Sequence, residues 1–321
     1  MKISVALCTH NGAAYVAQQV ESILAQTLQP SQIVLSDDAS TDNTVAIVRE
    51  LVERHPAIDL VVFENDPALR VTKNFEQAML ATTGDLVALS DQDDVWHPER
   101  LATIAAIFEQ RPEVLLVHSD ARLVDGEGAP LGTGLFESLE IADSELEAID
   151  DGRTLDVLLR RNVVTGATTV VRRDLVTTAA PFPESWVHDE WLAAIAAATG
   201  RTAVIRAQLV DYRQHGANQI GARRLGALEK ARKLAVPRED RNRGLVARAS
   251  DLVDRLEALS VTVDVLQKAR AKLVHESARY ALPAFRPARV ASVLRALRRG
   301  DYDRYSRGTL DAVRDLVQPA G

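Results

Sequence analysis

The run DLVALSDQDDVW, residues 85–96, joins a short apolar segment to a group of acidic side chains, and it determines the fold class predicted for the chain. Its first six residues predict a buried strand of a parallel sheet. Asp91, Asp93 and Asp94 follow where this strand ends, and carboxylates so close together repel each other unless a cation neutralises them. Oxygen ligands in this position suit Mg²⁺ or Mn²⁺, which commonly also bind a substrate's phosphates. The alternative is a solvated acidic loop before a helix that starts at Pro98.

Strands and helices alternate through the first 120 residues with short connections. Apolar runs predict the strands, and apolar residues at helical spacing predict the helices between them. Such alternation predicts a Rossmann-like α/β fold, in which helices cover both faces of a mostly parallel sheet. The expected strands are residues 3–8, 33–35, 58–63, 85–90 and 114–117.

Polar clusters follow three of these strands. Residues 9–12 (Thr-His-Asn-Gly) follow the first, Asp37 and Asp38 follow the second, and Asp91 and Asp93 follow the fourth. Parallel sheets bind ligands in the crevice at the carboxyl ends of their strands. Three polar clusters at one sheet edge therefore favour a ligand site over a solvated loop.

Composition limits the class of protein. The chain has 321 residues, 46% of them hydrophobic, which is enough for one large α/β domain and a smaller part. Its one cysteine, Cys8, is predicted to be a small buried hydrophobe, so no internal disulfide forms and a reducing compartment is indicated. The apolar start is too short for a signal peptide, and no run approaches the ~18 apolar residues of a transmembrane helix. These features predict a cytoplasmic protein.

Charge divides the chain into two parts. Residues 221–321 carry 22 Lys and Arg against 12 Asp and Glu, whereas residues 1–220 carry 16 against 33. Opposite signs predict two domains with different partners. We expect a catalytic domain over residues 1–221 and a basic, mainly helical region over residues 222–321.

The basic region ends in an amphipathic, Arg-rich segment, residues 286–299. This pattern predicts docking on anionic lipid headgroups, at the inner face of the membrane. The alternatives are a solvated face of a helical bundle and a subunit contact in a homo-oligomer. No aromatic residues are interleaved with the basic ones, which argues against a nucleic-acid partner.

Three motifs, in this order, resemble the signature segments of family-2 glycosyltransferases, which have the GT-A fold. They are CTHNG at residues 8–12, SDDASTDNT at 36–44 and LSDQDDVW at 89–96. The resemblance is strongest to the bacterial rhamnosyltransferase-like group, which builds cell-surface polysaccharides. It covers roughly residues 3–221. It implies an inverting, metal-dependent transfer from a nucleotide-diphospho-sugar (dTDP-rhamnose or a UDP-sugar) to a hydroxyl of a saccharide or lipid-linked saccharide.

The same resemblance implies roles on the donor side of the site. Asp93, the second Asp of the Asp-X-Asp element, would ligate Mn²⁺ or Mg²⁺, and Asp91 would face the ribose or a metal-bound water. Asp38 would accept a hydrogen bond from the ring N–H of the base, and Thr9 and Asn11 would shape the nucleotide pocket. The cation would act as a Lewis acid on the diphosphate leaving group.

Further donor-side residues lie outside the three motifs. Lys73 occupies a position where the family often has a basic nucleotide contact, although an ordinary surface lysine is the alternative. Residues 212–221 resemble a loop that folds over the donor, in which Arg213 would neutralise diphosphate charge and His215 would be a further metal ligand, unless it is structural. Gly166 lies in a segment resembling the floor of the sugar and acceptor pocket, where glycine permits close backbone approach.

The run WVHDEW, residues 186–191, is the second predicted chemical centre. Inverting transfer needs a group that accepts the proton of the attacking hydroxyl. By resemblance this base is Asp189, with His188 or Glu190 beside it, and the alternative is an ordinary helix cap. Trp186 and Trp191 could stack on a sugar face or pack in the core.

Two other functions remain open. A sugar-phosphate nucleotidyltransferase also uses a nucleotide-binding α/β sheet and Mg²⁺, but it usually opens with a Gly-rich phosphate loop and a basic residue, which residues 9–12 do not form. A non-catalytic sugar-binding relative would keep the fold and lose Asp93 or Asp189, and both are present.

Overall fold

The computed structural model describes residues 1–215 and 236–319, which fall into two compact units. The first unit comprises Met1–Gly152 and Val164–Arg223, and the second comprises Arg153–Val163 and Arg224–Gly321. The sequence assigns residues 153–163 to the first domain, but they pack with the second unit. The predicted boundary between residues 221 and 222 lies outside the described residues.

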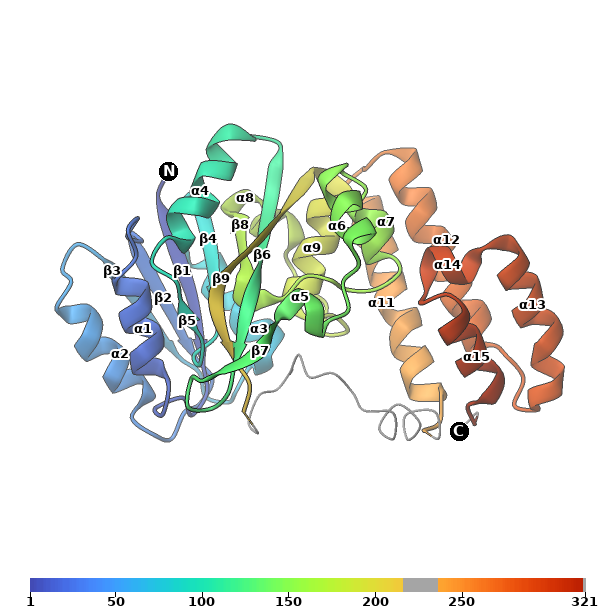
Figure 1. Cartoon of the computed structure of the whole chain (residues 1–321), viewed down its shortest axis with the longest axis horizontal. Helices are drawn as coiled ribbons and strands as arrows, with labels where there is room; N and C mark the ends of the chain where they lie inside the picture. Colours follow the sequence, from blue (N-terminus) through green and yellow to red (C-terminus); the bar gives the residue numbers. More distant parts are fainter. Residues whose placement is uncertain (216–235, 320–321) are drawn as a thin grey trace. The chain divides into compact units, whose positions relative to one another are not determined.

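One mixed sheet forms the centre of the described part of the first unit (Figure 1). Its order is β3-β2-β1-β4-β8-β6-β9-β5, with β7 paired to β6. β1 to β4 are mutually parallel, as are β6 and β9, whereas β5, β7 and β8 run antiparallel to their neighbours. The strands are β1 (Ile3–Thr9), β2 (Gln32–Asp37), β3 (Asp59–Glu64), β4 (Leu86–Ser90), β5 (Val95–Trp96), β6 (Val114–Val124), β7 (Pro130–Gly134), β8 (Thr169–Arg172) and β9 (Arg201–Arg213).

Helices cover both faces of this sheet, which confirms the predicted α/β class (Figure 1). Side chains on one face of β1, namely Ile3, Val5 and Leu7, share a core with α1, α2 and α4. α3 packs on β1 and β2 from the other face and is joined there by α8 and α9. These helices are α1 (Val16–Leu24), α2 (Thr44–Glu53), α3 (Arg70–Leu80), α4 (Arg100–Gln110), α8 (Arg173–Ala179) and α9 (His188–Thr199).

The register of the parallel strands places the polar turns after β1, β2 and β4 at the same edge of the sheet. Thr9 of β1 pairs with Asp37 of β2, and Leu7 of β1 pairs with Ser90 of β4. All three strands are parallel, so their carboxyl ends and the turns that follow lie at the same sheet edge. The predicted convergence of the three polar clusters is confirmed.

The segment between β6 and β8 has no apolar alternation that would predict a strand. Gly132-Thr133-Gly134 nevertheless forms part of β7, which pairs with β6. The acidic run that follows forms α5 (Leu135–Ser138) and α6 (Asp143–Asp150), and α6 buries Leu146 and Ile149. A short 3-10 turn, η1 (Gly166–Thr168), then leads into β8.

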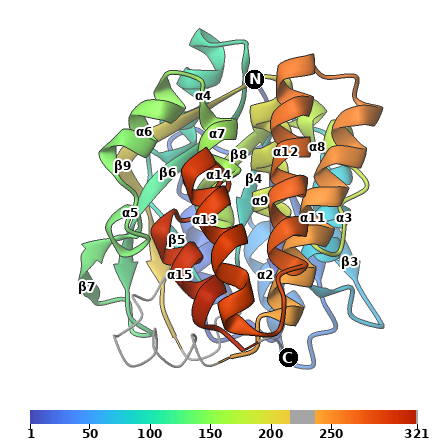
Figure 2. The same cartoon turned by 90° about the vertical axis from the view of Figure 1, so that its right-hand side faces the viewer.

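The described part of the second unit is helical, and α11 lies beside α12 (Figure 2). Among residues 1–215 and 236–319, no helix has both the length and the apolar character needed to cross a bilayer. The helices of this unit are α7 (Thr154–Leu158), α11 (Glu239–Ala258), α12 (Val263–Tyr280), η2 (Arg286–Arg289), α13 (Val290–Arg299), α14 (Asp301–Tyr305) and α15 (Thr309–Val317).

A buried network of charged side chains joins α12, α14 and α15. The Arg279 guanidinium donates to Asp315 Oδ2 at 2.6 Å and to Glu276 Oε2 at 3.0 Å. Lys272 Nζ donates to Glu276 Oε1 at 2.6 Å, and the Tyr302 hydroxyl donates to Asp315 Oδ2 at 2.8 Å. Because the apolar cluster around Tyr302 is small, this network carries much of the cohesion between these helices.

We expect Glu276→Gln to lower the free energy of unfolding of the second unit by about 3–5 kcal/mol, since it leaves buried cations under-compensated. Urea unfolding followed by far-UV circular dichroism measures this loss, whereas tryptophan fluorescence reports on Trp96, Trp186 and Trp191 of the first unit. Glu239→Gln is the matched control, because its partner Arg243 is exposed and the change should cost at most ~0.5 kcal/mol. Equal losses in the two variants would contradict the assignment.

The network also gives stability a pH dependence. Burial alone would raise the pKa of Glu276, but the charges of Lys272 and Arg279 outweigh it and hold that pKa below its usual value. A carboxyl group with a lowered folded-state pKa stabilises the fold above its unfolded pKa, and this contribution is lost as pH falls through the folded-state value. Acid should therefore destabilise the wild-type second unit more than Glu276→Gln.

Candidate active site

The turn after β2 is held by Thr9 of β1. Thr9 Oγ1 donates to Asp37 Oδ1 at 2.6 Å, and both the backbone N–H and the hydroxyl of Ser40 donate to the same carboxylate. Thr9 and Asp37 are buried. Thr9 therefore holds the turn after β2 in place, and its role in shaping a nucleotide pocket stays a prediction.

Asn11 links the turns after β1 and β2. Its φ is 49°, in the left-handed region that asparagine tolerates better than most residues. Its backbone N–H donates to Ser40 Oγ at 2.7 Å, and its Oδ1 accepts from the Thr41 N–H at 2.9 Å. Asn11 is exposed at this sheet edge, where a ligand can reach it.

Asp38 is attached to the start of α3. Its two carboxylate oxygens accept hydrogen bonds from the backbone N–H groups of Leu69 at 2.5 Å and Arg70 at 2.9 Å. Each oxygen keeps a further lone pair, so these bonds leave acceptor capacity for a ligand. Sequence reasoning did not reveal this anchoring role.

The Asp-X-Asp turn is fastened to the turn after β1 by its middle residue. Gln92 accepts from the His10 N–H at 2.8 Å and donates to the His10 carbonyl at 3.1 Å. A Cβ added at Gly12 would lie 2.2 Å from Gln92 Oε1, so glycine is needed there for the two turns to meet. Asp91 and Asp93 are thereby fixed relative to the first turn.

The structure brings together the two predicted metal ligands. His215 Nε2 lies 2.7 Å from Asp93 Oδ2, although 122 residues separate them. The His215 ring stacks on Tyr15, with ring centroids 4.8 Å apart. The rest of the predicted covering loop, residues 216–221, lies outside the described residues.

Arg213 supports the acidic turn. Its guanidinium donates to the Asp93 carbonyl at 2.7 Å, the Gly126 carbonyl at 2.9 Å and Gln18 Oε1 at 2.6 Å, and its backbone N–H donates to Asp94 Oδ1 at 3.1 Å. Arg213 is 2% exposed. The guanidinium therefore holds the acidic turn, the loop at Gly126 and α1 together, and a contact of Arg213 with the diphosphate stays a prediction.

Asp189 lies in the first turn of α9, facing the 3-10 turn η1. Its Oδ2 accepts from the Gly166 N–H at 2.7 Å, and its Oδ1 accepts from the Glu190 N–H at 2.7 Å. A Cβ at Gly166 would lie 2.9 Å from His188 Nε2 and 3.5 Å from Asp189 Oδ2, so a larger residue would crowd these two side chains. Gly166 thus permits close approach to the predicted base.

The carboxylates of the acidic turn after β4 interact electrostatically with Asp189, the predicted base. Burial, together with the charges of Asp93 and Asp189, raises the pKa of Asp91 to about 7. Burial and the charges of Asp93 and Asp91 also raise the pKa of Asp94 well above its usual value. The acidic turn after β4 and the start of α9 therefore share one environment, in which a divalent cation would relieve repulsion.

Asp93 and His215 fit a divalent cation that also binds a substrate. The described residues contain no group of three or more His, Cys, Asp or Glu side chains arranged to hold a metal by themselves. Mg²⁺ and similar ions usually take one or two protein ligands and complete their coordination with waters and substrate phosphates. The side chains of Asp93 and His215 therefore suit a metal ion that is also bound by a diphosphate.

The aromatic residues near Asp189 pack inward. Trp191 is 1% exposed, and its Nε1–H donates to the Ala179 carbonyl at 2.8 Å. His188 is buried and stacks on Phe75 with centroids 3.8 Å apart. Trp191 thus packs in the core, which is one of the two predicted positions, and a role of His188 and Trp191 in the sugar and acceptor pocket stays a prediction. Trp186, half-buried with its ring 5.4 Å from that of Trp191, keeps the candidate role.

Glu190 and Lys73 are partly exposed. Glu190 is half-buried beside Asp189 and stays a candidate for the acceptor pocket. The Lys73 ammonium donates to Glu76 Oε2 and to the Phe182 carbonyl, both at 2.7 Å, which ties α3 to the segment after α8. A nucleotide contact for Lys73 stays a prediction.

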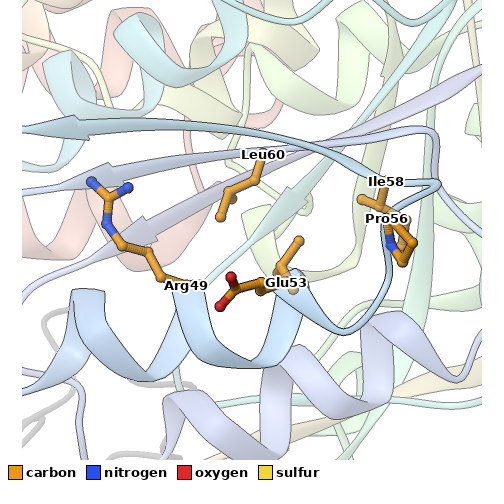
Figure 3. A pocket seen from close by; sticks show the side chains of 6 residues that line it. Arg49, Glu53, Pro56, Ile58 and Leu60 are labelled. Carbon is orange, nitrogen blue, oxygen red and sulfur yellow. The ribbon is translucent and has the colours of Figure 1, made fainter.

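A separate pocket of about 350 Å³ lies between α2 and β3 (Figure 3). It is lined by Arg49, Glu53, Pro56, Ile58 and Leu60, among others. Ile58 and Leu60 lie at the amino end of β3, which is the sheet edge opposite the acidic turns. This pocket is therefore distinct from the candidate site.

Comparisons with known proteins agree with this geometry. The family model described as "Glycosyl transferase family 2" matches residues 4–174, more than half of the chain. An "uncharacterized glycosyltransferase", alr2836 of Nostoc sp., is 28% identical over 224 residues, which are 68% of this chain and 66% of that protein.

Two solved structures have a similar fold. S. aureus TarS 1–349, solved in complex with UDP-GlcNAc, has a TM-score of 0.60 at 17% identity, over 98% of this chain and 90% of TarS. The mannosyltransferase PcManGT of Pyrobaculum calidifontis, solved with GDP-Man and Mn²⁺, has a TM-score of 0.56 at 19% identity, over 92% of this chain and 74% of that one. The parallel strands with their acidic turn, the family match and the shared GT-A fold lead to one conclusion: the chain belongs to glycosyl transferase family 2.

Proposed function

We propose that the protein is an inverting, divalent-metal-dependent glycosyltransferase. It would move a sugar from a nucleotide-diphospho-sugar to a hydroxyl of a saccharide or lipid-linked saccharide, in the synthesis of a cell-surface polysaccharide. The proposal rests on two observations. Asp93 contacts His215, and Asp91 interacts electrostatically with both Asp93 and Asp189. Inverting transfer needs these two functions, diphosphate stabilisation and a base, in one place.

On the donor side, Asp38 would accept a hydrogen bond from the base, Thr9 and Asn11 would shape the nucleotide pocket, and Asp91 would face the ribose or a metal-bound water. Asp93 and His215 would hold Mn²⁺ or Mg²⁺, which when bound supplies positive charge to the departing diphosphate. PcManGT, whose structure contains Mn²⁺ beside GDP-Man, supports a metal of this type. A UDP-sugar or dTDP-rhamnose is the proposed donor, the former supported by the TarS complex and the latter by the motif resemblance.

On the acceptor side, Asp189 would take the proton from the attacking hydroxyl. Backbone N–H groups hold its two oxygens in place, and each oxygen keeps a lone pair for the proton. Gly166, Trp186 and Glu190 would border the acceptor. The Gly166 contact favours this role over a plain helix cap, because it orients the carboxylate from outside α9.

A panel of nucleotide-sugars incubated with Mn²⁺ tests the proposal. Release of a nucleoside diphosphate supports glycosyl transfer or slow donor hydrolysis. Conversion with pyrophosphate to a sugar-1-phosphate and nucleoside triphosphate would indicate the nucleotidyltransferase alternative. Binding without turnover on any donor and acceptor would indicate a non-catalytic relative.

The second unit has a surface suited to anionic lipid. α15 exposes Leu310, Val313 and Val317 on one side, and the adjoining α13 exposes Val290 and Leu294. The exposed arginines of this region are Arg286, Arg295, Arg298, Arg299, Arg304 and Arg307. Apolar side chains beside exposed arginines favour a membrane surface over bulk solvent.

The acidic residues of this region offset only part of that charge. Asp301 lies 3.9 Å from Arg299 and Asp303 is exposed, whereas Asp311 and Asp315 are buried and pair with Arg241 and Arg279. We therefore propose that the protein acts in the cytoplasm at the inner face of a membrane, where a lipid-linked acceptor is within reach. The alternative is that this surface forms a contact between subunits of a homo-oligomer.

We expect Arg295→Glu/Arg298→Glu to weaken binding to vesicles containing anionic phosphatidylglycerol by at least about 10-fold, because each arginine contributes about 1 kcal/mol near such a surface. Co-sedimentation with these vesicles and with neutral phosphatidylcholine vesicles measures the effect. Arg54→Glu, at the exposed residue that follows α2, is the control. Unchanged vesicle binding with altered sedimentation velocity would assign the surface to a subunit contact.

A further inference from the structure

Arg100, the first residue of α4, is a buried cation beside the acidic turn. It is 0% exposed, and its guanidinium lies over the Trp96 ring at 3.8 Å from the centroid. Its sequence position signals this, because Arg100, Ile104 and Phe108 follow one another at four-residue spacing along the inward face of the helix. Sequence analysis nevertheless missed it.

Hydrogen bonds alone do not account for a guanidinium at this position. Its Nη2 donates to the Ala167 carbonyl at 2.9 Å, while in the described part of the chain its Nε and Nη1 have no hydrogen-bond partner. Asp94 Oδ2 is likewise buried without one. A buried charge with so few hydrogen bonds is stable only where opposite charge lies nearby.

That opposite charge comes from the acidic turn. Burial lowers the pKa of Arg100 to about 9, but Asp94 and Asp91 oppose the shift, and the guanidinium remains charged near neutral pH. The same positive charge acts back on both carboxylates. Arg100 is therefore a counter-charge built into the fold beside a turn that must stay acidic to attract a cation.

The hydrogen bond to Ala167 connects this counter-charge with the other centre. Ala167 follows Gly166 in the 3-10 turn η1, and the Gly166 N–H is the group that binds Asp189 Oδ2 at 2.7 Å. One guanidinium thus joins Trp96, two residues after the acidic turn, to the turn that orients Asp189. A shift of η1 would move the Gly166 N–H and, with it, the Asp189 carboxylate.

We propose that Arg100 is a positioning residue that couples the two halves of the active site. Its charge offsets the repulsion within the acidic turn, and its bond to Ala167 fixes the turn that orients Asp189. This inference rests on the proposed glycosyl transfer for its kinetic part, but not for its effect on cation binding.

Two substitutions separate the charge from the hydrogen bond. Arg100→Lys keeps the charge, but its single ammonium lacks the planar fork that covers Trp96 while reaching Ala167. It should keep the donor KM within about 3-fold and lower kcat by about 10- to 100-fold, the usual size of an outer-shell effect. Arg100→Gln loses both features and should lower kcat at least as much.

Cation binding supplies a readout that needs no activity. With the counter-charge removed, Arg100→Gln without metal should melt below both wild type and Arg100→Lys. Mn²⁺ alone, titrated without donor, should then raise its Tm by more than it raises theirs, since the uncompensated turn binds the cation more tightly. Arg111→Gln, at the exposed end of the same helix, should match wild type throughout.

Two results would contradict the proposal. A wild-type kcat in Arg100→Lys would show that Arg100 does not position Asp189. Equal Mn²⁺-induced changes in Tm in all variants would show that Arg100 does not act as a counter-charge. If Arg100→Gln does not fold, the split between kcat and KM in Arg100→Lys still decides. If the wild type transfers no sugar from any donor, the proposed function fails, while the Mn²⁺ titration continues to test Arg100.

Discussion

Replacing Asp189 with asparagine should lower kcat for sugar transfer by about 10²- to 10⁴-fold, the usual contribution of a positioned general base. Asparagine has nearly the same shape, and its carbonyl oxygen can still accept one of the two backbone N–H bonds that Asp189 receives from Gly166 and Glu190. It cannot accept a proton at neutral pH. Donor binding should therefore stay close to wild type while turnover collapses.

Single-turnover kinetics with a saturating donor, and calorimetry of nucleoside diphosphate binding, separate these two effects. Glu190→Gln is the comparison variant, because it neutralises the adjacent carboxylate and leaves Asp189 in place, so that any loss of turnover should be smaller. Turnover of Asp189→Asn within a few fold of wild type would assign the base to another group. A fall in both variants would point to Glu190 as a partner in proton transfer.

Replacing Asp93 with alanine should abolish the dependence of donor binding on Mn²⁺ or Mg²⁺. Asp93 is the carboxylate that the structure pairs with His215, so its loss removes one of two protein ligands and the anionic charge that attracts the cation. We expect the affinity for a nucleoside diphosphate in Mn²⁺ to fall at least about 100-fold, equivalent to about 2.7 kcal/mol. Binding without metal should change little.

Calorimetric titration with and without Mn²⁺ measures this difference. His215→Ala should show a smaller loss in the same direction, since it removes a neutral ligand and no charge. Asp150→Ala, at an exposed carboxylate of α6 paired with Arg206, should behave as wild type. A persisting Mn²⁺ requirement in Asp93→Ala would move the metal to a different set of ligands.

The sequence predicts the strands of residues 3–90 well because the local signals there agree with the global fold. Each expected strand from residue 3 to residue 90 is bounded by turn residues, and the polar clusters follow directly at strand ends. Of the later strands, β6 is predicted only over residues 114–117, and β7 and β9 are not predicted. β7 is Gly-rich, and β9 has its apolar residues interrupted at positions 206–208, so neither shows a clear alternation.

Residue roles are harder to predict than residue positions. Residue type suggests a diphosphate contact for Arg213 and either a sugar contact or core packing for Trp191, and both are buried in contacts that no spacing rule reveals. Gln92 and Arg100 were missed for the converse reason. A side chain that holds two turns together is defined by its distant partners, and a single sequence does not identify them.

The attachment of Asp38 to the beginning of α3 bears on how donor preference could be re-engineered. Under the proposed function one carboxylate reads the nucleobase and also fastens the backbone at Leu69 and Arg70, where Arg70 has a φ of 68°. A library randomised at Asp38 would therefore lose most of its members to misplaced helices before any new base could be tested. Variation at exposed Asn11 and Thr41 should yield more functional clones, because those side chains border the same turn without supporting a helix.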